Sequence, residues 1–226
     1  MKYLKYFFAN KTMVLMCFAY VILLGSLEMW LNNYNDYYNF TTEIHRELNK
    51  YWIWIVVSYV YYFDMNRNMV SRLIINGGKR DIIWINKLIA ILIVLSLTSV
   101  ISAVIRTKSV LEINLLQDLI YDIMRRMVLG VVVNSIMSLG CMIINNISVI
   151  VMVLYIYLSP WMNMVLVNQC SNSNNILLKN NPLYLAIKLY NNKTCEYEDI
   201  IIVLVFFISL WCVSLFMFRR KEFRGC

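Results

Sequence analysis

Long apolar runs separated by short polar segments are the main pattern along the chain. The runs over 87–105 and 200–218 hold no charged residue beyond Lys87. A helix needs about 20 apolar residues to cross about 30 Å of hydrocarbon, and a soluble helix would show a polar stripe at a period of 3.6 residues. The runs lack that stripe, so we predict six membrane-spanning helices. Their approximate ranges are 12–30, 51–65, 85–105, 127–144, 147–167 and 200–218.

The composition supports this interpretation. Of the 226 residues, 61% are hydrophobic and 15% are charged, whereas soluble domains are nearer about 45–50% apolar and about 25% charged. The sequence therefore predicts an all-α integral membrane protein, with residues 1–226 forming a single transmembrane domain.

The distribution of basic residues predicts the orientation. With six spans both ends of the chain lie on one side, and the segments on that side carry 12 of the 21 Lys and Arg residues. These segments are also much shorter in total than those on the other side. Because cytoplasmic loops are enriched in Lys and Arg, we expect the N- and C-termini in the cytoplasm. The resulting basic collar would contact anionic lipids of the inner leaflet.

Three outer segments are expected, over 31–50, 106–126 and 168–199. The second is either a loop or an amphipathic helix lying in the interface, and its apolar face would be formed by Leu116, Ile120, Ile123 and Met127. The third contains a helix-compatible stretch from Pro182 to Tyr190. It also holds Cys170 and Cys195, which could form a disulfide only in an oxidising compartment.

Residues for covalent chemistry are not found in the sequence. The Gly-Lys pair at 78–79 is followed by Arg80, and Leu73 stands where a phosphate-binding loop needs its first glycine, so the chain should not bind ATP there. The single histidine, His45, has no histidine partner for a zinc site. No basic groove suggests nucleic-acid binding. The predicted spans hold almost no charge, so any transport would need energy from another subunit.

The segment between the second and third predicted spans combines an amphipathic stretch with a glycine pair. Residues 67–76 fit a short helix with one apolar and one polar face. Gly77 and Gly78 would end that helix, and Lys79, Arg80 and Asp81 would begin the next one, which enters the membrane at Trp84. We predict a short helix at the cytoplasmic face, resting on lipid or docking onto a partner.

This organisation resembles the membrane subunits of ATP-binding cassette transporters of the type-2 exporter class. In that family an acidic residue, a coupling helix, a glycine and a basic residue join the second and third spans, and a lysine opens the third. The corresponding residues here are Asp64, the helix at 67–76, the Gly77-Gly78 pair, Arg80 and Lys87. A tight turn after the fourth span and the basic C-terminal sequence FMFRRKEF add to the resemblance.

The resemblance implies a permease subunit for an amphipathic peptide, bacteriocin or lipid-like substrate, as in export and immunity systems. It implies two ATPase subunits that bind ATP and magnesium, and a second permease that is either identical or different. The contacts to the ATPase would fall on the following residues: Asp64, Arg67, Arg72, Asn76, Gly77, Gly78 and Arg80.

The Asn-, Ile-, Lys- and Tyr-rich composition is typical of AT-rich genomes and favours the cytoplasmic membrane of a bacterium. Alternative hypotheses are a non-transporting immunity, scaffold or sensor protein, and a membrane enzyme, for which the sequence offers no catalytic group. The resemblance itself leaves the substrate-binding residues and the direction of transport open.

Overall fold

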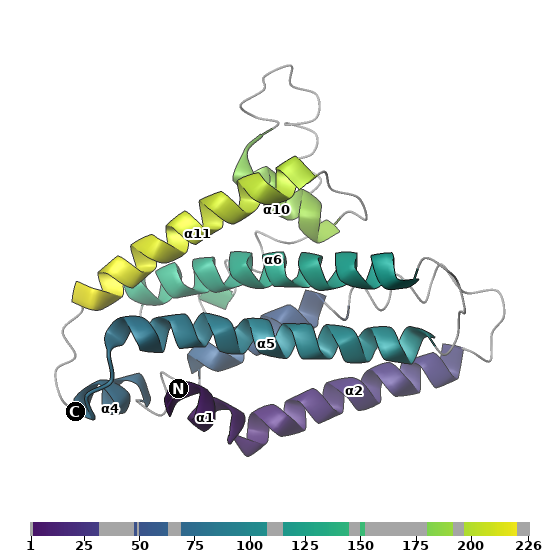
Figure 1. The fold of residues 1–226 in the computed structure, drawn as a ribbon, viewed down its shortest axis with the longest axis horizontal. Coiled ribbons are helices and arrows are strands. Elements are labelled where there is room, and N and C mark those ends of the chain that lie inside the picture. The colour runs from purple at the N-terminus through teal and green to yellow at the C-terminus, as the bar shows by residue number, and fades with distance from the viewer. Residues whose placement is uncertain are drawn as a thin grey trace. The chain divides into compact units, whose positions relative to one another are not determined.

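The computed structural model describes residues 2–31, 48, 50–62, 69–107, 115–144, 150–151, 180–191 and 197–220, and all regular secondary structure in these ranges is helical. The chain forms two compact units, one of residues 1–56 and 85–127 and the other of residues 57–84 and 128–226. The named helices are α1 (Lys2–Phe8), α2 (Lys11–Leu31), α4 (Met69–Ile75), α5 (Arg80–Thr107), α6 (Leu115–Ile143), α10 (Pro182–Asn191) and α11 (Tyr197–Arg220) (Figure 1).

Three of the described helices are long and apolar enough to cross a membrane. They cover Arg80–Ser102 of α5, Ile123–Ile143 of α6 and Tyr197–Arg220 of α11, and a shorter apolar helix covers Lys11–Leu27 of α2. The all-helical class predicted from the sequence is therefore confirmed for the described residues, and these three helices have the length and apolar composition of membrane spans. Residues 50–62 of the second predicted span are helical, whereas most of the fifth predicted span lies outside the described residues.

The first unit is built around α2, residues 50–56 and most of α5. The side chain of Asn10 begins α2 by accepting a hydrogen bond from the Thr12 N–H at 3.1 Å, as N-cap residues do. Tyr20 of α2 stacks on Trp52, with ring centroids 4.3 Å apart. The Trp52 indole N–H donates to Thr98 Oγ1 of α5 at 3.0 Å, so one buried tryptophan joins all three helices.

Two helix boundaries fall within the predicted outer segment over 106–126. Helix α5 continues to Thr107, and α6 begins at Leu115 and runs without a break past Met127, so residues 115–126 are helical and continuous with the fourth predicted span. No glycine or proline interrupts residues 115–127, so the helix continues across the predicted boundary. The candidate span consequently includes Arg125 and Arg126, and the prediction of a nearly uncharged fourth span holds only from Met127 onward.

Arg126 is buried, and its Nη2 lies 3.4 Å from Ser102 Oγ of α5 within the first unit. Lys87, which the resemblance places at the opening of the third span, is buried as well. Both cations are placed by the packing of neighbouring helices, which the linear hydrophobic pattern does not describe.

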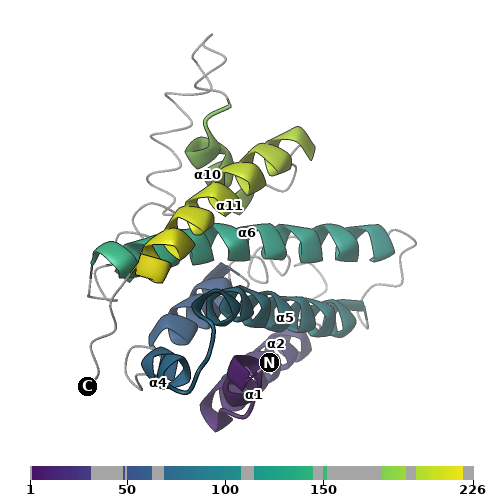
Figure 2. The ribbon, with the colours of Figure 1, turned by 60° about the vertical axis from the view of Figure 1, so that its left-hand side comes forward.

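The second unit contains α4, the first turn of α5, the second half of α6, α10 and α11. Helix α10 packs beside the start of α11 (Figure 2). Asn181 caps α10 through its side chain, which accepts a hydrogen bond from the Leu183 N–H at 2.9 Å, and Pro182 occupies the first helical position, where its missing N–H costs nothing. The helix predicted at 182–190 is thus confirmed, one residue longer at its C-terminal end.

Candidate functional site

Helix α4 has the amphipathic character predicted for the segment between the second and third spans. Val70 and Leu73 are buried, whereas Arg72 is exposed and Ile75 is 70% exposed. The outward face therefore combines the cation of Arg72 with the exposed apolar side chain of Ile75. Such a mixed face suits contact with a partner surface better than solvation alone.

The glycine pair ends α4 with a specific hydrogen-bonded turn. Gly77 has a φ of 78°, and its N–H donates to the Ile74 carbonyl at 3.0 Å, while the Gly78 N–H donates to the Leu73 carbonyl at 2.8 Å. These are the two hydrogen bonds of a Schellman motif. A Cβ on Gly78 would lie 2.6 Å from the Leu73 oxygen. The turn therefore requires glycine at 77 for its backbone angle and at 78 for space.

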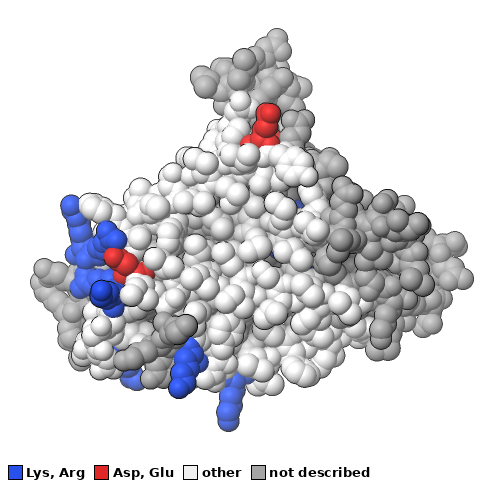
Figure 3. Space-filling model, viewed as in Figure 1, with Lys and Arg blue, Asp and Glu red and all other residues white. Residues whose placement is uncertain are grey.

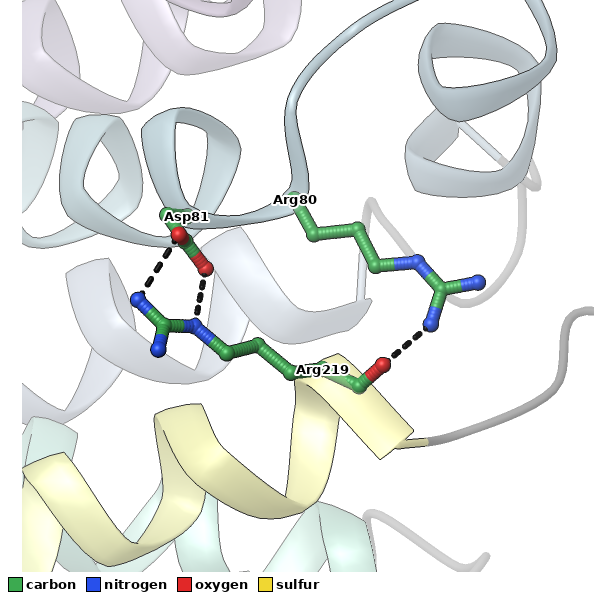
Figure 4. Close-up of polar contacts among 3 residues, drawn as sticks. All are labelled: Arg80, Asp81 and Arg219. Atoms are coloured by element: carbon green, nitrogen blue, oxygen red, sulfur yellow. Dashed lines mark hydrogen bonds and ion pairs between the residues drawn. The ribbon is translucent and has the colours of Figure 1, made fainter.

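The first turn of α5 is bound to the last turn of α11 by three side chains (Figure 4). Asp81 accepts two hydrogen bonds from Arg219, with Nε–Oδ1 at 2.5 Å and Nη2–Oδ2 at 2.7 Å. Arg80 donates from Nη1 to the main-chain carbonyl of Arg219 at 2.5 Å. That carbonyl is one of those left without a helical partner at the end of α11. Two consecutive residues thus hold both the side chain and the backbone of Arg219.

Trp84 forms a second contact between the same two helices, one turn further along α5. Its ring stacks on Phe218 at a centroid distance of 4.4 Å and meets Tyr61 edge-on at 6.2 Å. Its indole N–H lies 3.4 Å from Ser214 Oγ. All four side chains are buried, so this contact adds buried aromatic packing between α5 and α11.

Buried polar side chains continue from this tryptophan into α6. Ser214 Oγ and Ser138 Oγ are 2.9 Å apart, and the Tyr61 hydroxyl donates to Asn134 Oδ1 at 2.9 Å. Asn134 Nδ2 is buried and finds no hydrogen-bond acceptor in the part of the chain that the structure describes. Hydrogen bonds between neighbouring apolar helices fix their register, so the two serines align α6 with α11 and Asn134 aligns α6 with the helix that carries Tyr61.

Ser138 and Ser214, which contact each other, lie at similar distances from the middle of their candidate spans. Ser138 and Ser214 each lie about five residues, or about 8 Å, beyond the middle of their span. Both helices would therefore cross the membrane in the same direction. The predicted topology likewise gives the fourth and sixth spans one direction, and their crossing of a membrane stays a prediction.

Charge separates the two ends of α11. Glu198 and Asp199 lie in its first turn and Arg219 and Arg220 in its last. Figure 3 shows acidic side chains at one end of this helix and clustered basic side chains at the other, with an uncharged surface between them. Each sign of charge lies at the end that the helix dipole favours. At the acidic end Asp199 pairs with Lys188 of α10 at 2.7 Å.

The structure places five of the seven residues predicted to contact an ATPase within one short segment. Arg72 and Asn76 are exposed on α4 and at its end, Gly77 and Gly78 form the turn, and Arg80 is half-buried against the end of α11. The other two, Asp64 and Arg67, lie outside the described residues, as do Cys170 and Cys195.

Sequence reasoning missed the partners that complete this site, namely Asp81, Trp84, Phe218 and Arg219. The available signal was an isolated acid among basic residues at the start of one span and a basic cluster at the end of another. Opposite charges at two helix ends on the same side of a membrane are candidates for pairing, but the sequence does not show which helices are neighbours.

Among the described residues no cluster of three or more His, Cys, Asp or Glu side chains could hold a metal ion, and Cys17 and Cys212 are free thiols. No protein-family model, curated protein or solved structure matches the chain. A function for the chain is therefore argued from its residues and from the geometry of α4, α5 and α11.

Proposed function

We propose that the chain is the permease subunit of an ATP-driven exporter of the type-2 ATP-binding cassette class, in the cytoplasmic membrane of a bacterium. It works as a homodimer, or as a heterodimer with a second permease, on two separate ATPase subunits that bind ATP and magnesium. Its cargo is an amphipathic peptide, a bacteriocin or a lipid-like molecule. The chain itself performs no covalent chemistry.

One observation carries this proposal: α4 is a short amphipathic helix joined by a rigid glycine turn to an apolar helix of 28 residues. Such an element transmits a push applied at the membrane surface, because the turn that joins it to the long helix has little freedom to bend. The turn is a Schellman motif, whose two hydrogen bonds hold the end of α4 in one backbone conformation.

The outward face of α4 supports a protein partner. Ile75 is the exposed apolar residue of this face, and Arg72 and Asn76 flank it. Protein interfaces combine an apolar centre with a polar rim and favour arginine. A cytoplasmic ATPase with an acidic, partly apolar groove would fit this face.

The test is the amount of ATPase subunit that co-purifies with the tagged chain from its native membranes. Replacing Arg67 and Arg72 together by Glu should lower the association constant for the ATPase roughly a hundredfold, or by about 3 kcal/mol, because charge reversal at an interface places like charges together. The amount of co-purified ATPase should fall accordingly. The matched control reverses Lys5 and Lys11, which are exposed on α1 and at the start of α2, and should leave the amount unchanged.

An unchanged ratio of ATPase to permease in the Arg67/Arg72 variant would contradict a docking role for α4. Failure of the unmodified chain to retain any ATPase subunit would favour the alternative function, a non-transporting immunity, scaffold or sensor protein of the membrane.

A further inference from the structure

The end of α11 contacts the start of α5, directly after α4, at the exposed Asp81 and again at the buried Trp84. We propose that α4, the start of α5 and the end of α11 form one rigid lever. The lever consists of residues 69–84 and 214–220, and Asp81 and Arg219 are the residues that hold its two parts in position. On the proposed function, on which this step rests, the lever carries a displacement of α4 into the last helix of the chain.

The first part of the lever is stiff because of its turn. The Asn76 N–H donates to the Arg72 carbonyl at 3.0 Å, ahead of the two Schellman hydrogen bonds of Gly77 and Gly78. The next helix begins at Arg80, two residues after the glycine pair. Almost no freely rotating backbone separates α4 from α5, so a tilt of α4 must tilt the start of α5.

The second part is joined by contacts that differ in kind. At the surface, the paired hydrogen bonds of Asp81 fix the direction of the Arg219 guanidinium, as bidentate pairs do. Arg80 fixes the carbonyl of the same residue. These groups are exposed, at 54% for Arg219 and 41% for Asp81, so they add little to global stability. Their role is to orient the end of α11.

Below the surface, α5 and α11 meet again, one turn further along α5. Trp84 lies three residues after Asp81 and therefore on the same side of α5, and Phe218 directly precedes Arg219. Their stacked rings form a buried contact beneath the exposed ion pair. Two contacts separated along the helix axes resist rotation of α11 about either one, which a single contact would permit.

In this arrangement Asp81 holds the end of α11 in position, and does not only neutralise a positive charge. A lysine or a lipid headgroup would neutralise an exposed carboxylate equally well, but would not hold α11. Removing the Asp81 charge should therefore loosen the end of α11 relative to α4 while leaving the docking face of α4 intact.

The test measures the distance between α4 and α11 in the isolated full-length chain in lipid nanodiscs. In a variant whose native cysteines are replaced, spin labels are attached at two exposed positions, Ile75 of α4 and Val205 of α11, and the distance distribution is recorded by pulsed electron paramagnetic resonance. Asp81→Asn should widen this distribution and add longer distances. Arg219→Gln should do the same, and combining the two should add no further widening, because both remove one interaction.

Lys188→Gln is the matched control, because it breaks the ion pair at the opposite end of the same helix. It should leave the distribution between residues 75 and 205 unchanged. A distribution that stays narrow in Asp81→Asn, or that widens as much in Lys188→Gln, would overturn the lever.

A second measurement separates the lever from the proposed function. Asp81→Asn should retain the ATPase subunit at the ratio of the unmodified chain, because α4 keeps its outward face. Loss of the ATPase from this variant alone would assign Asp81 to docking and overturn its positioning role. Lack of ATPase binding by the unmodified chain would contradict the proposed function, and the distances in the isolated chain would remain a valid test of the lever.

Discussion

The two ends of α11 are each held by an ion pair to another helix, yet the two pairs differ in reach and surroundings. Lys188 and Asp199 are 11 residues apart and partly buried, with side chains 28% and 14% exposed. Asp81 and Arg219 are 138 residues apart and more exposed. The first pair closes a local hairpin of two helices, and the second joins distant parts of the chain.

The difference shows that a contact's energy and its structural role need not coincide. The local pair is better shielded from water, and so contributes more to stability, but α10 and α11 are already neighbours in sequence. The distant pair contributes little energy by itself, and its importance comes from which helices it orients. The buried stack of Trp84 on Phe218 supplies the packing energy that the distant pair lacks.

The largest effect is expected from removing the buried stack of Trp84 on Phe218. Trp84→Ala should destabilise the chain by about 3–5 kcal/mol, as expected for a buried tryptophan whose cavity cannot collapse. Tyr197→Ala, at the other end of α11 where the ring is 76% exposed, should have almost no effect. Thermal unfolding in detergent measures both, and an equal loss in the two variants would show that the ends are not packed differently.

Breaking the local ion pair of Lys188 and Asp199 should have a smaller effect on stability, confined to α10. Lys188→Met leaves Asp199 without its partner and should weaken the docking of α10 by about 1 kcal/mol. Amide exchange in α10 should then become roughly fivefold faster, since 1.4 kcal/mol corresponds to a factor of ten. Exchange in α4 should not change. Faster exchange throughout the second unit would contradict the local character of this pair.

The smallest effect is expected for the serine contact between α6 and α11. A double-mutant cycle of Ser138→Ala and Ser214→Ala should give a coupling of about 0.6 kcal/mol, the typical value for hydrogen bonds between membrane helices. The cycle is measured by unfolding in detergent. A coupling of zero would mean that packing alone sets the register of these helices, and would remove the support that this contact gives to their parallel direction.

Much of the local structure was predictable from the sequence. The short helix before the glycine pair, the restart at Arg80 and the helix beginning at Pro182 are all confirmed, because each is specified by neighbouring residues. Glycine at a left-handed position and proline at a first helical position act over a few residues only. The continuity of α6 across Met127 was not predicted, because Arg125 and Arg126 were taken as the edge of a span although no glycine or proline there stops a helix.

The sequence by itself determined that α2, α5, α6 and α11 are apolar helices and that the chain turns at the Gly77-Gly78 pair. It did not determine that Asp81 meets Arg219, that Trp84 stacks on Phe218, or that Arg126 is buried. Several basic residues on the same predicted side could neutralise Asp81 equally well, and several apolar faces could cover Trp84. Pair energies of this size do not choose a partner across 138 residues. Only the tertiary structure makes the choice, because the summed packing of whole helix faces sets which helix ends are neighbours.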